Sequence, residues 1–245
     1  MTKLLRLLFF CVVVLAIAGA AAVGLGIWHF GRDLPDYQQL ADYEPPVTTR
    51  VYAGDGRLLA EHATERRVFV PIAAIPKRVV AAFLSAEDKN FYTHRGVDPI
   101  SILRAALTDL GRWGNDRRPV GASTITQQVA KNLFLWSGRS FVRKGLEAYF
   151  TVLLEACWPK QRILEVYLNV VEMGDGVYGA EAAARVHFNR RAAELTPLQG
   201  ALIAGVLPSP RIRADAIDAP YMRARAALIQ QRTAKTPFGE KRVCP

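Results

Sequence analysis

The chain is 245 residues long, and hydrophobic residues make up 51% of it. This apolar content excludes a disordered chain, and the length leaves room for one membrane segment and one domain of roughly 200 residues. Lys and Arg outnumber Asp and Glu by 32 to 22, which gives a formal net charge of +10 at pH 7. Such a surplus indicates an anionic partner: nucleic acid, phospholipid headgroups or a phosphorylated substrate.

An uncharged apolar run from Leu7 to Ile27 follows Lys3 and Arg6 near the N-terminus. A helix rises about 1.5 Å per residue, so this run is long enough to cross a hydrocarbon core about 30 Å thick. Because the basic residues precede the run, we predict a transmembrane anchor over residues 1–30 with its N-terminus in the cytoplasm. A cleaved signal peptide is the alternative, since the run also contains small residues. The following residues then lie outside the inner membrane, so we expect no nucleic-acid partner.

Beyond the anchor we predict a linker over 31–47, one domain over 48–235 and a C-terminal tail over 236–245. A Gly-Asp-Gly turn predicts a β-hairpin at the start of the domain. Apolar residues at helical spacing, capping residues and prolines predict helices over about 79–90, 99–113, 123–134, 140–157, 159–169, 198–207 and 221–232. Strands and helices do not alternate, so the predicted fold class is mainly α with a minor β-hairpin.

The first polar stretch, residues 87–98, directly follows an apolar helix. Glu87 therefore lies near the end of that helix, where its carboxylate is partly enclosed. A carboxylate in such a place can have a raised pKa and act as a general base. The alternative is a salt bridge at the helix end, which is the commoner outcome for a lone Glu-Asp pair.

The second polar stretch offers hydroxyl, amide and ammonium groups. On a helix, Ser123, Gln127 and Lys131 share one face, with Thr124 and Gln128 beside them. Sugars and pyrophosphates are bound by donors of this kind. A solvated helix face is the alternative, but such faces usually include acidic residues and this stretch has none.

The third polar stretch contains Arg143, Lys144 and Glu147. The two cations precede the carboxylate by four and three positions, so all three side chains lie on one side of a helix. As surface ion pairs they contribute only a few tenths of a kcal/mol. As part of a site, the two cations can bind a diphosphate leaving group.

Three cysteines, Cys11, Cys157 and Cys244, have neither metal-ligand nor redox spacing. We expect no disulfide framework, since Cys157 and Cys244 can pair only if the tail folds back. The sequence also shows no His/Asp cluster, so we predict no metal site and no required cofactor.

Five motifs occur in order between residues 80 and 230. The first three are Glu-Asp-x-x-Phe-x-x-His-x-Gly-x-Asp, Gly-x-Ser-Thr-Ile-Thr-Gln-Gln-x-x-Lys-Asn-Leu-Phe-Leu and Arg-Lys-x-x-Glu, and the others span 160–169 and 176–184. Together they resemble the family 51 glycosyltransferases, the peptidoglycan polymerase modules found alone or at the front of class A penicillin-binding proteins. The anchor-plus-module layout is closest to the monofunctional members. The chain has His187-Phe188 where the fifth motif often ends in Tyr-Phe, which puts a role for the aromatic residue at 187 in doubt.

The resemblance implies polymerisation of lipid II into β-1,4-linked glycan, with inversion and release of undecaprenyl diphosphate. It implies that Glu87 is the general base and that Glu147 is a second catalytic carboxylate near the diphosphate. The residues expected to bind substrate are Ser123, Thr124, Gln127, Gln128, Lys131, Asn132, Arg143 and Lys144. The residues expected to support the site are Asp88, Phe91, His94, Gly96, Glu165 and Asn169.

The resemblance further implies a lysozyme-like α domain with a membrane-facing lobe that includes the loop 111–120. Residues 133–136 either dip into lipid or form the end of a core helix. The expected partners are lipid II, the growing glycan chain, the inner membrane and other cell-wall synthesis proteins. A divalent cation assists diphosphate binding in some family members, and the catalytic domain is expected to face the periplasm.

Three other functions stay open from the sequence. A lysozyme-like hydrolase protonates an unactivated leaving sugar and needs no diphosphate-binding cations, so Lys131, Arg143 and Lys144 argue against it. A bifunctional penicillin-binding protein needs Ser-x-x-Lys and Lys-Thr-Gly motifs, which do not occur in this sequence, so we expect no transpeptidase activity. A non-enzymatic scaffold has no need of the two glutamates.

Overall fold

A computed structural model describes residues 3–31, 49–52, 54, 58–62, 66–110, 121–136, 138 and 140–234. The chain divides into two compact units, residues 1–43 and 44–245. The first unit contains α1 (Lys3–Gly31). Among the described residues, no helix is long and apolar enough to cross a membrane. The predicted loop 111–120, the predicted tail and most of the predicted linker lie outside the described residues.

The predicted β-hairpin is confirmed. Strands β1 (Thr49–Tyr52) and β2 (Leu58–His62) pair antiparallel, and the register shifts near the turn. The Gly-Asp-Gly sequence lies between them, as expected for a hairpin connection.

A second small sheet was not predicted. It consists of β3 (Arg66–Arg67), β4 (Glu172–Gly174) and β5 (Val177–Tyr178) in the order β3-β5-β4, with β3 parallel and β4 antiparallel to β5. Gly179 follows β5 with φ +83°, and a Cβ there would lie 2.8 Å from the carbonyl oxygen of Asn169. Only glycine fits this close approach, which seats the sheet against the preceding helix.

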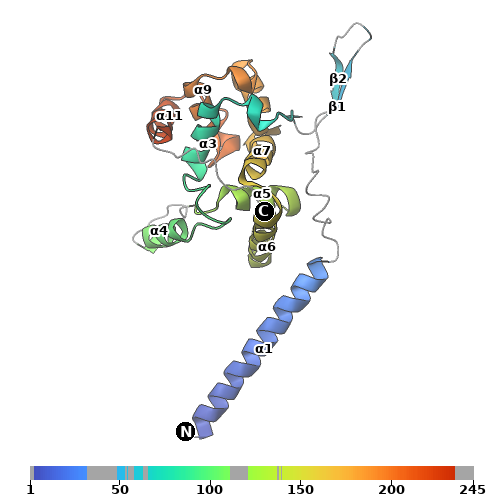
Figure 1. Cartoon of the computed structure of the whole chain (residues 1–245), viewed down its shortest axis with the longest axis vertical. Helices are drawn as coiled ribbons and strands as arrows, with labels where there is room; N and C mark the ends of the chain where they lie inside the picture. The colour runs from blue at the N-terminus through green and yellow to red at the C-terminus, as the bar shows by residue number, and fades with distance from the viewer. Residues whose placement is uncertain are drawn as a thin grey trace. The chain divides into compact units, whose positions relative to one another are not determined.

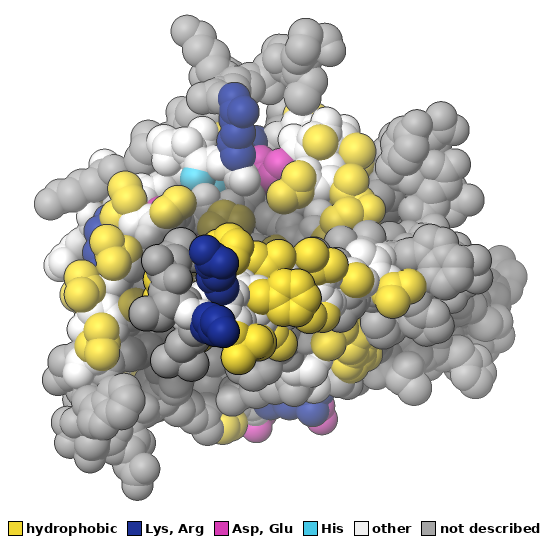
Figure 2. All heavy atoms as spheres, turned by 90° about the horizontal axis from the view of Figure 1, so that it is seen from below, with side chains coloured by type: hydrophobic (Ala, Val, Ile, Leu, Met, Phe, Trp, Pro, Cys, Tyr) yellow, Lys and Arg dark blue, Asp and Glu magenta, His cyan; other side chains and the backbone are white. Residues whose placement is uncertain are grey.

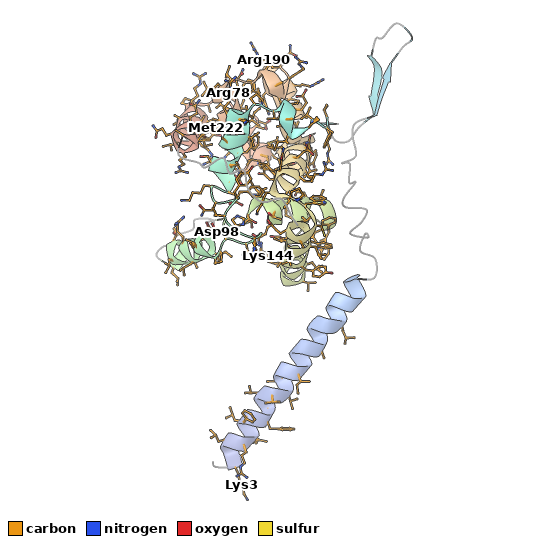
Figure 3. All side chains as sticks on the ribbon, in the orientation of Figure 1. Lys3, Arg78, Asp98, Lys144, Arg190 and Met222 are labelled. Atoms are coloured by element: carbon orange, nitrogen blue, oxygen red, sulfur yellow. The ribbon has the colours of Figure 1, made fainter. Side chains whose placement is uncertain are left out.

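One group of packed helices comprises α3 (Lys77–Glu87), α9 (Pro197–Val206) and α11 (Pro220–Thr233), with the short α10 (Pro210–Arg213) beside it (Figure 1). Thr196 caps α9, as predicted, and exchanges hydrogen bonds with Gln199. Gly200 brings α9 close to α3, since a Cβ there would lie 3.0 Å from Val79. Met222 of α11 is fully buried in this core (Figure 3).

The other group comprises α5 (Ile125–Phe134), α6 (Phe141–Cys157) and α7 (Lys160–Val170), and α5 contacts both of its partners (Figure 1). These three helices confirm the sequence prediction to within a few residues. Helix α8 (Gly179–Phe188) packs on α7 and carries the fifth motif. Short 3-10 turns, η1 (Ile72–Ala74) and η2 (Ala192–Glu194), complete the described part.

Helix α4 (Pro99–Leu110) forms as predicted, but its apolar face is exposed. Ile100, Leu103, Leu107 and Leu110 are each 60–63% exposed, and the helix stands apart from its neighbours (Figure 1). Figure 2 shows exposed hydrophobic side chains in yellow in the view from below, and α1 also carries many exposed apolar side chains. An amphipathic pattern therefore predicted the helix correctly but not what covers its apolar side.

The alternatives for 133–136 and for the cysteines can be compared with the structure. Phe134 is half-buried and stacks on Phe150 at a centroid distance of 4.5 Å, whereas Trp136 is exposed. Phe134 thus belongs to the end of a core helix, whereas Trp136 lies at the surface. Cys11 and Cys157 are free and exposed.

Candidate active site

Glu87 is the last residue of α3, and its carboxylate faces α5. The amide Nε2 of Gln128 donates a hydrogen bond to Glu87 Oε2 at 2.9 Å. Burial raises the pKa of Glu87, and the Gln128 bond and the charge of Arg225 only partly offset that rise. The carboxylate is therefore a stronger base than an exposed glutamate, in agreement with the expectation from its place at a helix end.

The loop after α3 is tied to the start of α5. Asp88 Oδ2 accepts a hydrogen bond from the backbone nitrogen of Ile125 at 3.1 Å, and His94 Nε2 lies 3.0 Å from both Asp88 oxygens. The Thr124 hydroxyl donates to the carbonyl oxygen of Gly96 at 2.5 Å. These bonds hold both ends of the loop 88–96 against the start of α5. Because this loop directly follows Glu87, they also fix Glu87 relative to α5.

Helix α5 begins later than predicted, and this changes the expected polar stripe. Thr124 is the N-cap: its hydroxyl accepts from the Gln127 nitrogen and its own nitrogen donates to the Gln127 side chain. The predicted shared helical face of Ser123, Gln127 and Lys131 is therefore wrong, since Ser123 precedes the helix. Thr124 and Gln127 are buried, whereas Lys131 and Asn132 are exposed.

Glu147 is buried on α6 and lies between two cations. Arg143 Nη1 donates to Glu147 Oε2 at 3.3 Å, and Lys144 Nζ forms a salt bridge with Oε1. The Lys144 ammonium, which is labelled in Figure 3, also lies 3.4 Å from Ser123 Oγ. Arg143 Nε is buried without a hydrogen-bond partner in the described part of the chain. The spacing of the third motif thus predicted this cluster correctly.

Helix α5 joins the two carboxylates. Its residue Gln128 holds Glu87, and Ser123, just before the helix, contacts Lys144, which holds Glu147. A basic carboxylate and a second carboxylate with excess positive charge are thus both linked to the segment 123–128, the first through Gln128 and the second through the contact of Lys144 with Ser123. Such a pair can accept a proton at one end and stabilise a departing anion at the other.

Other motif residues bind the backbone around the site. The Asn169 side chain accepts from Val70 N and donates to Val70 O, both at 2.9 Å. Glu165 Oε2 accepts from Ile72 N at 2.9 Å. Phe91 is fully buried, with Lys160 Nζ 4.4 Å from its ring centroid. These contacts are of the kind expected for supporting residues, and that role stays a prediction.

Sequence reasoning gave no role to several residues that the structure brings to the site. Tyr167 is fully buried, and burial together with the charges of Glu87 and Asp88 raises its pKa. Asp98 accepts bonds from Ile100 N and Ser101 N at the start of α4. Burial opposes its ionisation, but hydrogen bonds from Ser101 and Asn90 outweigh it and lower the pKa of Asp98 to about 2. Its place directly before Pro99 is a capping signal from which this contact could have been predicted.

The carboxylates of the site are not gathered into a metal-binding cluster in the described part of the chain. Among the described residues, no group of three or more His, Cys, Asp or Glu side chains lies close enough to hold a metal ion. The Glu147 carboxylate is already bound by two cations. These side chains do not fit a metal held by the protein alone.

Residues 55–234 match the family model described as Transglycosylase. The chain belongs to the transglycosylase family. It is therefore a glycosyltransferase, and the five motifs that predicted this relationship all lie within the matched region.

Curated relatives agree with this assignment. A biosynthetic peptidoglycan transglycosylase from Stutzerimonas stutzeri is 52% identical over 165 residues, which cover 67% of this chain and 66% of the relative. A penicillin-binding protein 1A from Rickettsia felis is 47% identical over 206 residues, 83% of this chain. The chain spans only 26% of that protein. A solved penicillin-binding protein 1A from Haemophilus influenzae matches at a TM-score of 0.41 and 22% identity over 81% of this chain and 20% of that one.

Proposed function

We propose that this glycosyltransferase polymerises lipid II into β-1,4-linked peptidoglycan strands and releases undecaprenyl diphosphate. The observation that carries the proposal is the pair of carboxylates joined through α5, one held by a neutral amide and the other by two cations. Relatives named biosynthetic peptidoglycan transglycosylase, about 50% identical to this chain, support the substrate class.

In this mechanism Glu87 is the base. The 4-hydroxyl of the acceptor GlcNAc attacks the anomeric carbon of the MurNAc that ends the growing chain, and its proton passes to the Glu87 carboxylate. The bond from the anomeric carbon to the diphosphate oxygen breaks, and its electron pair leaves with the diphosphate. Attack opposite the leaving group inverts the configuration. Burial strengthens Glu87 as a base, because it raises the pKa of its carboxyl group.

The cations around Glu147 stabilise the leaving group. Arg143 and Lys144 carry two positive charges against one carboxylate. The Nε donor of Arg143 has no hydrogen-bond partner in the described part of the chain, so it is available to bind an anion. A diphosphate is a good leaving group once its charge is neutralised, so no general acid is required. Lys131 and Asn132 are exposed at the end of the same helix α5 and complete the proposed substrate-binding set. Ser123, Gln127 and Gln128 would orient the sugar or the diphosphate.

A divalent cation would be held mainly by the diphosphate, and it would supply further neutralisation of the charge on the leaving group. The protein residues do not offer a cluster of their own for it, within the part of the chain that is described.

The location and the partners are further parts of the proposal. We place residues 7–27 in the inner membrane, with the catalytic unit in the periplasm and cell-wall synthesis proteins as partners, on the strength of the uncharged apolar run. Extraction of the chain by alkaline carbonate without detergent would contradict the anchor. We also propose that these residues carry no transpeptidase activity, and labelling by a fluorescent penicillin would contradict it.

The test of the function is incubation of the detergent-solubilised chain with labelled lipid II. We expect wild type to form long polymer and Glu87→Gln to lose about 10²–10⁴-fold in rate, because a general base contributes that much. Glutamine keeps an acceptor for Gln128, so the fold is retained. Glu172→Gln is the matched control, since Glu172 binds Arg211 at the surface.

Three outcomes distinguish the alternatives. Equal polymer from wild type and Glu87→Gln would remove Glu87 as base and keep the reaction. Shortening of added glycan without polymer would favour a hydrolase. No reaction from folded wild type in any detergent would favour a scaffold.

A further inference from the structure

Two arginines converge on one backbone carbonyl at the C-terminal end of α9. Arg213 Nη1 of α10 and Arg225 Nε of α11 donate to the Gly205 oxygen at 3.2 and 3.0 Å. Neither arginine forms a salt bridge with a carboxylate of the described residues. Two positive charges therefore lie side by side, both half-buried, with a neutral acceptor between them.

Capping of the helix does not account for both arginines. A cation near a helix C-terminus is favourable, and one guanidinium is enough to satisfy the Gly205 carbonyl. A second one adds repulsion: burial and the charge of Arg213 both lower the pKa of Arg225. The pair thus has an electrostatic cost that capping does not require, and a nearby negative charge is needed to offset it.

Glu87 supplies that negative charge. Helix α3, which ends at Glu87, packs against α9 and α11, and the Ser85 hydroxyl donates to the Ile229 carbonyl of α11 at 3.3 Å. The interaction is mutual, since Glu87 raises the pKa of Arg225 while both arginines lower that of Glu87.

The other groups that face Glu87 act in different directions. Asp88 next to it raises the pKa of Glu87, and α5 contributes the neutral donor Gln128, which lowers it. Helix α7 contributes Tyr167, whose own pKa is raised by Glu87. Helix α9 carries no titratable side chain. The arginine pair is therefore the source of positive charge that balances burial and Asp88.

We propose that Arg213 and Arg225 are positioning residues of the glycosyltransferase site, whose charge keeps Glu87 ionised over the pH range in which it must accept a proton. This inference rests on the proposed role of Glu87 as base. Burial alone would strengthen the base but would also favour its protonated form, which cannot accept a proton. The two guanidiniums restore ionisation through space rather than through a hydrogen bond to Glu87.

The test is the pH dependence of lipid II polymerisation in Arg225→Met and Arg213→Met. Loss of one positive charge raises the pKa of Glu87, so the acidic limb of the profile moves to higher pH, by about 0.5–1 unit. Below the limb the rate falls about threefold to tenfold, and above it the rate returns to the wild-type value. Arg225→Lys keeps the charge and restores the wild-type limb. Arg223→Met is the matched control, because Arg223 is exposed on the same helix.

Each single variant leaves the other arginine on the Gly205 carbonyl, so α9 keeps its cap. A rate that falls equally at every pH would reduce the pair to a structural cap and overturn the proposal. A raised KM with an unmoved limb would make the pair a ligand site for an anion, which also overturns it.

A direct titration separates this inference from the function. Side-chain carboxyl ¹³C signals of glutamate, assigned for Glu87 by loss in Glu87→Gln, report its ionisation without turnover. We expect a higher midpoint in Arg225→Met than in wild type, even if lipid II were not the substrate. An unchanged midpoint would contradict the inference while leaving the proposed reaction intact.

Discussion

The two carboxylates of the site are the same chemical group in opposite surroundings. Glu87 is held by one neutral amide, whereas Glu147 is held by Arg143 and Lys144. A carboxylate with a neutral partner and a raised pKa is able to take up a proton during the reaction. A carboxylate between two cations instead serves as their counter-charge and fixes where they point. The role of each carboxylate is therefore decided by its partners and not by the residue type.

The two cations beside Glu147 also differ in exposure. Arg143 and Lys144 have side chains that are 12% and 51% exposed, although both pair with Glu147. The buried guanidinium is held more firmly, since the exposed ammonium is screened by water and free to move. We therefore expect the two cations to differ in their effect on the leaving group.

Glu147→Gln gives the largest effect on the cationic end. Removal of the counter-charge leaves Arg143 and Lys144 without the acceptor that orients them, and we expect kcat/KM to fall about 10²–10³-fold. Single-turnover assays with lipid II measure it, and Glu194→Gln in the exposed η2 turn is the control. Activity near that of the control would show that Glu147 is no part of the site.

Arg143→Met and Lys144→Met sharpen the comparison within the cationic end. We expect about a tenfold to hundredfold loss of kcat/KM for Arg143→Met, because its guanidinium is buried beside the carboxylate. Lys144→Met should lose at most about tenfold, since half of that side chain is exposed. Arg190→Met, at an exposed position (Figure 3), should be silent. The reverse order of the two losses would contradict this account.

Gln128→Met gives the smallest effect, and it acts on Glu87 rather than on the cations beside Glu147. The hydrogen bond from Gln128 lowers the pKa of Glu87, so its loss raises that pKa further. The protonated fraction then grows at acidic pH, where we expect a rate loss of about threefold to tenfold that disappears as the pH is raised. Rate measurements across pH check this, with wild type in the same buffers. A loss of the same size at every pH would show that Gln128 acts through substrate binding alone and would contradict its effect on the pKa of Glu87.

Local signals in the sequence predicted most of the fold. The hairpin turn, the cap at Thr196 and the apolar spacing of α3, α5, α6 and α7 are each encoded within a few neighbouring residues. The sheet β3-β5-β4 was missed because strands of two or three residues show no alternation. The late start of α5 was predictable, since Thr124 and Gln127 have capping-box spacing.

The residues of the candidate site also divide into those predicted from local spacing and those that were missed. Arg143, Lys144 and Glu147 lie within five positions on one helix, so their spacing alone predicted the cluster. The arginine pair gave no such signal, because Arg213 and Arg225 approach Glu87 only through the packing of α3, α9 and α11. Contacts between segments far apart in the chain leave no local pattern to read.

The most direct test of the contrast is the pH profile of the residual lipid II transfer in Glu87→Gln and Glu147→Gln. We expect Glu147→Gln to be slow but to keep the acidic limb, because Glu87 still titrates. We expect Glu87→Gln to be slow and to lose that limb. If the limb survived in Glu87→Gln and vanished in Glu147→Gln, the roles given to the two carboxylates would be wrong.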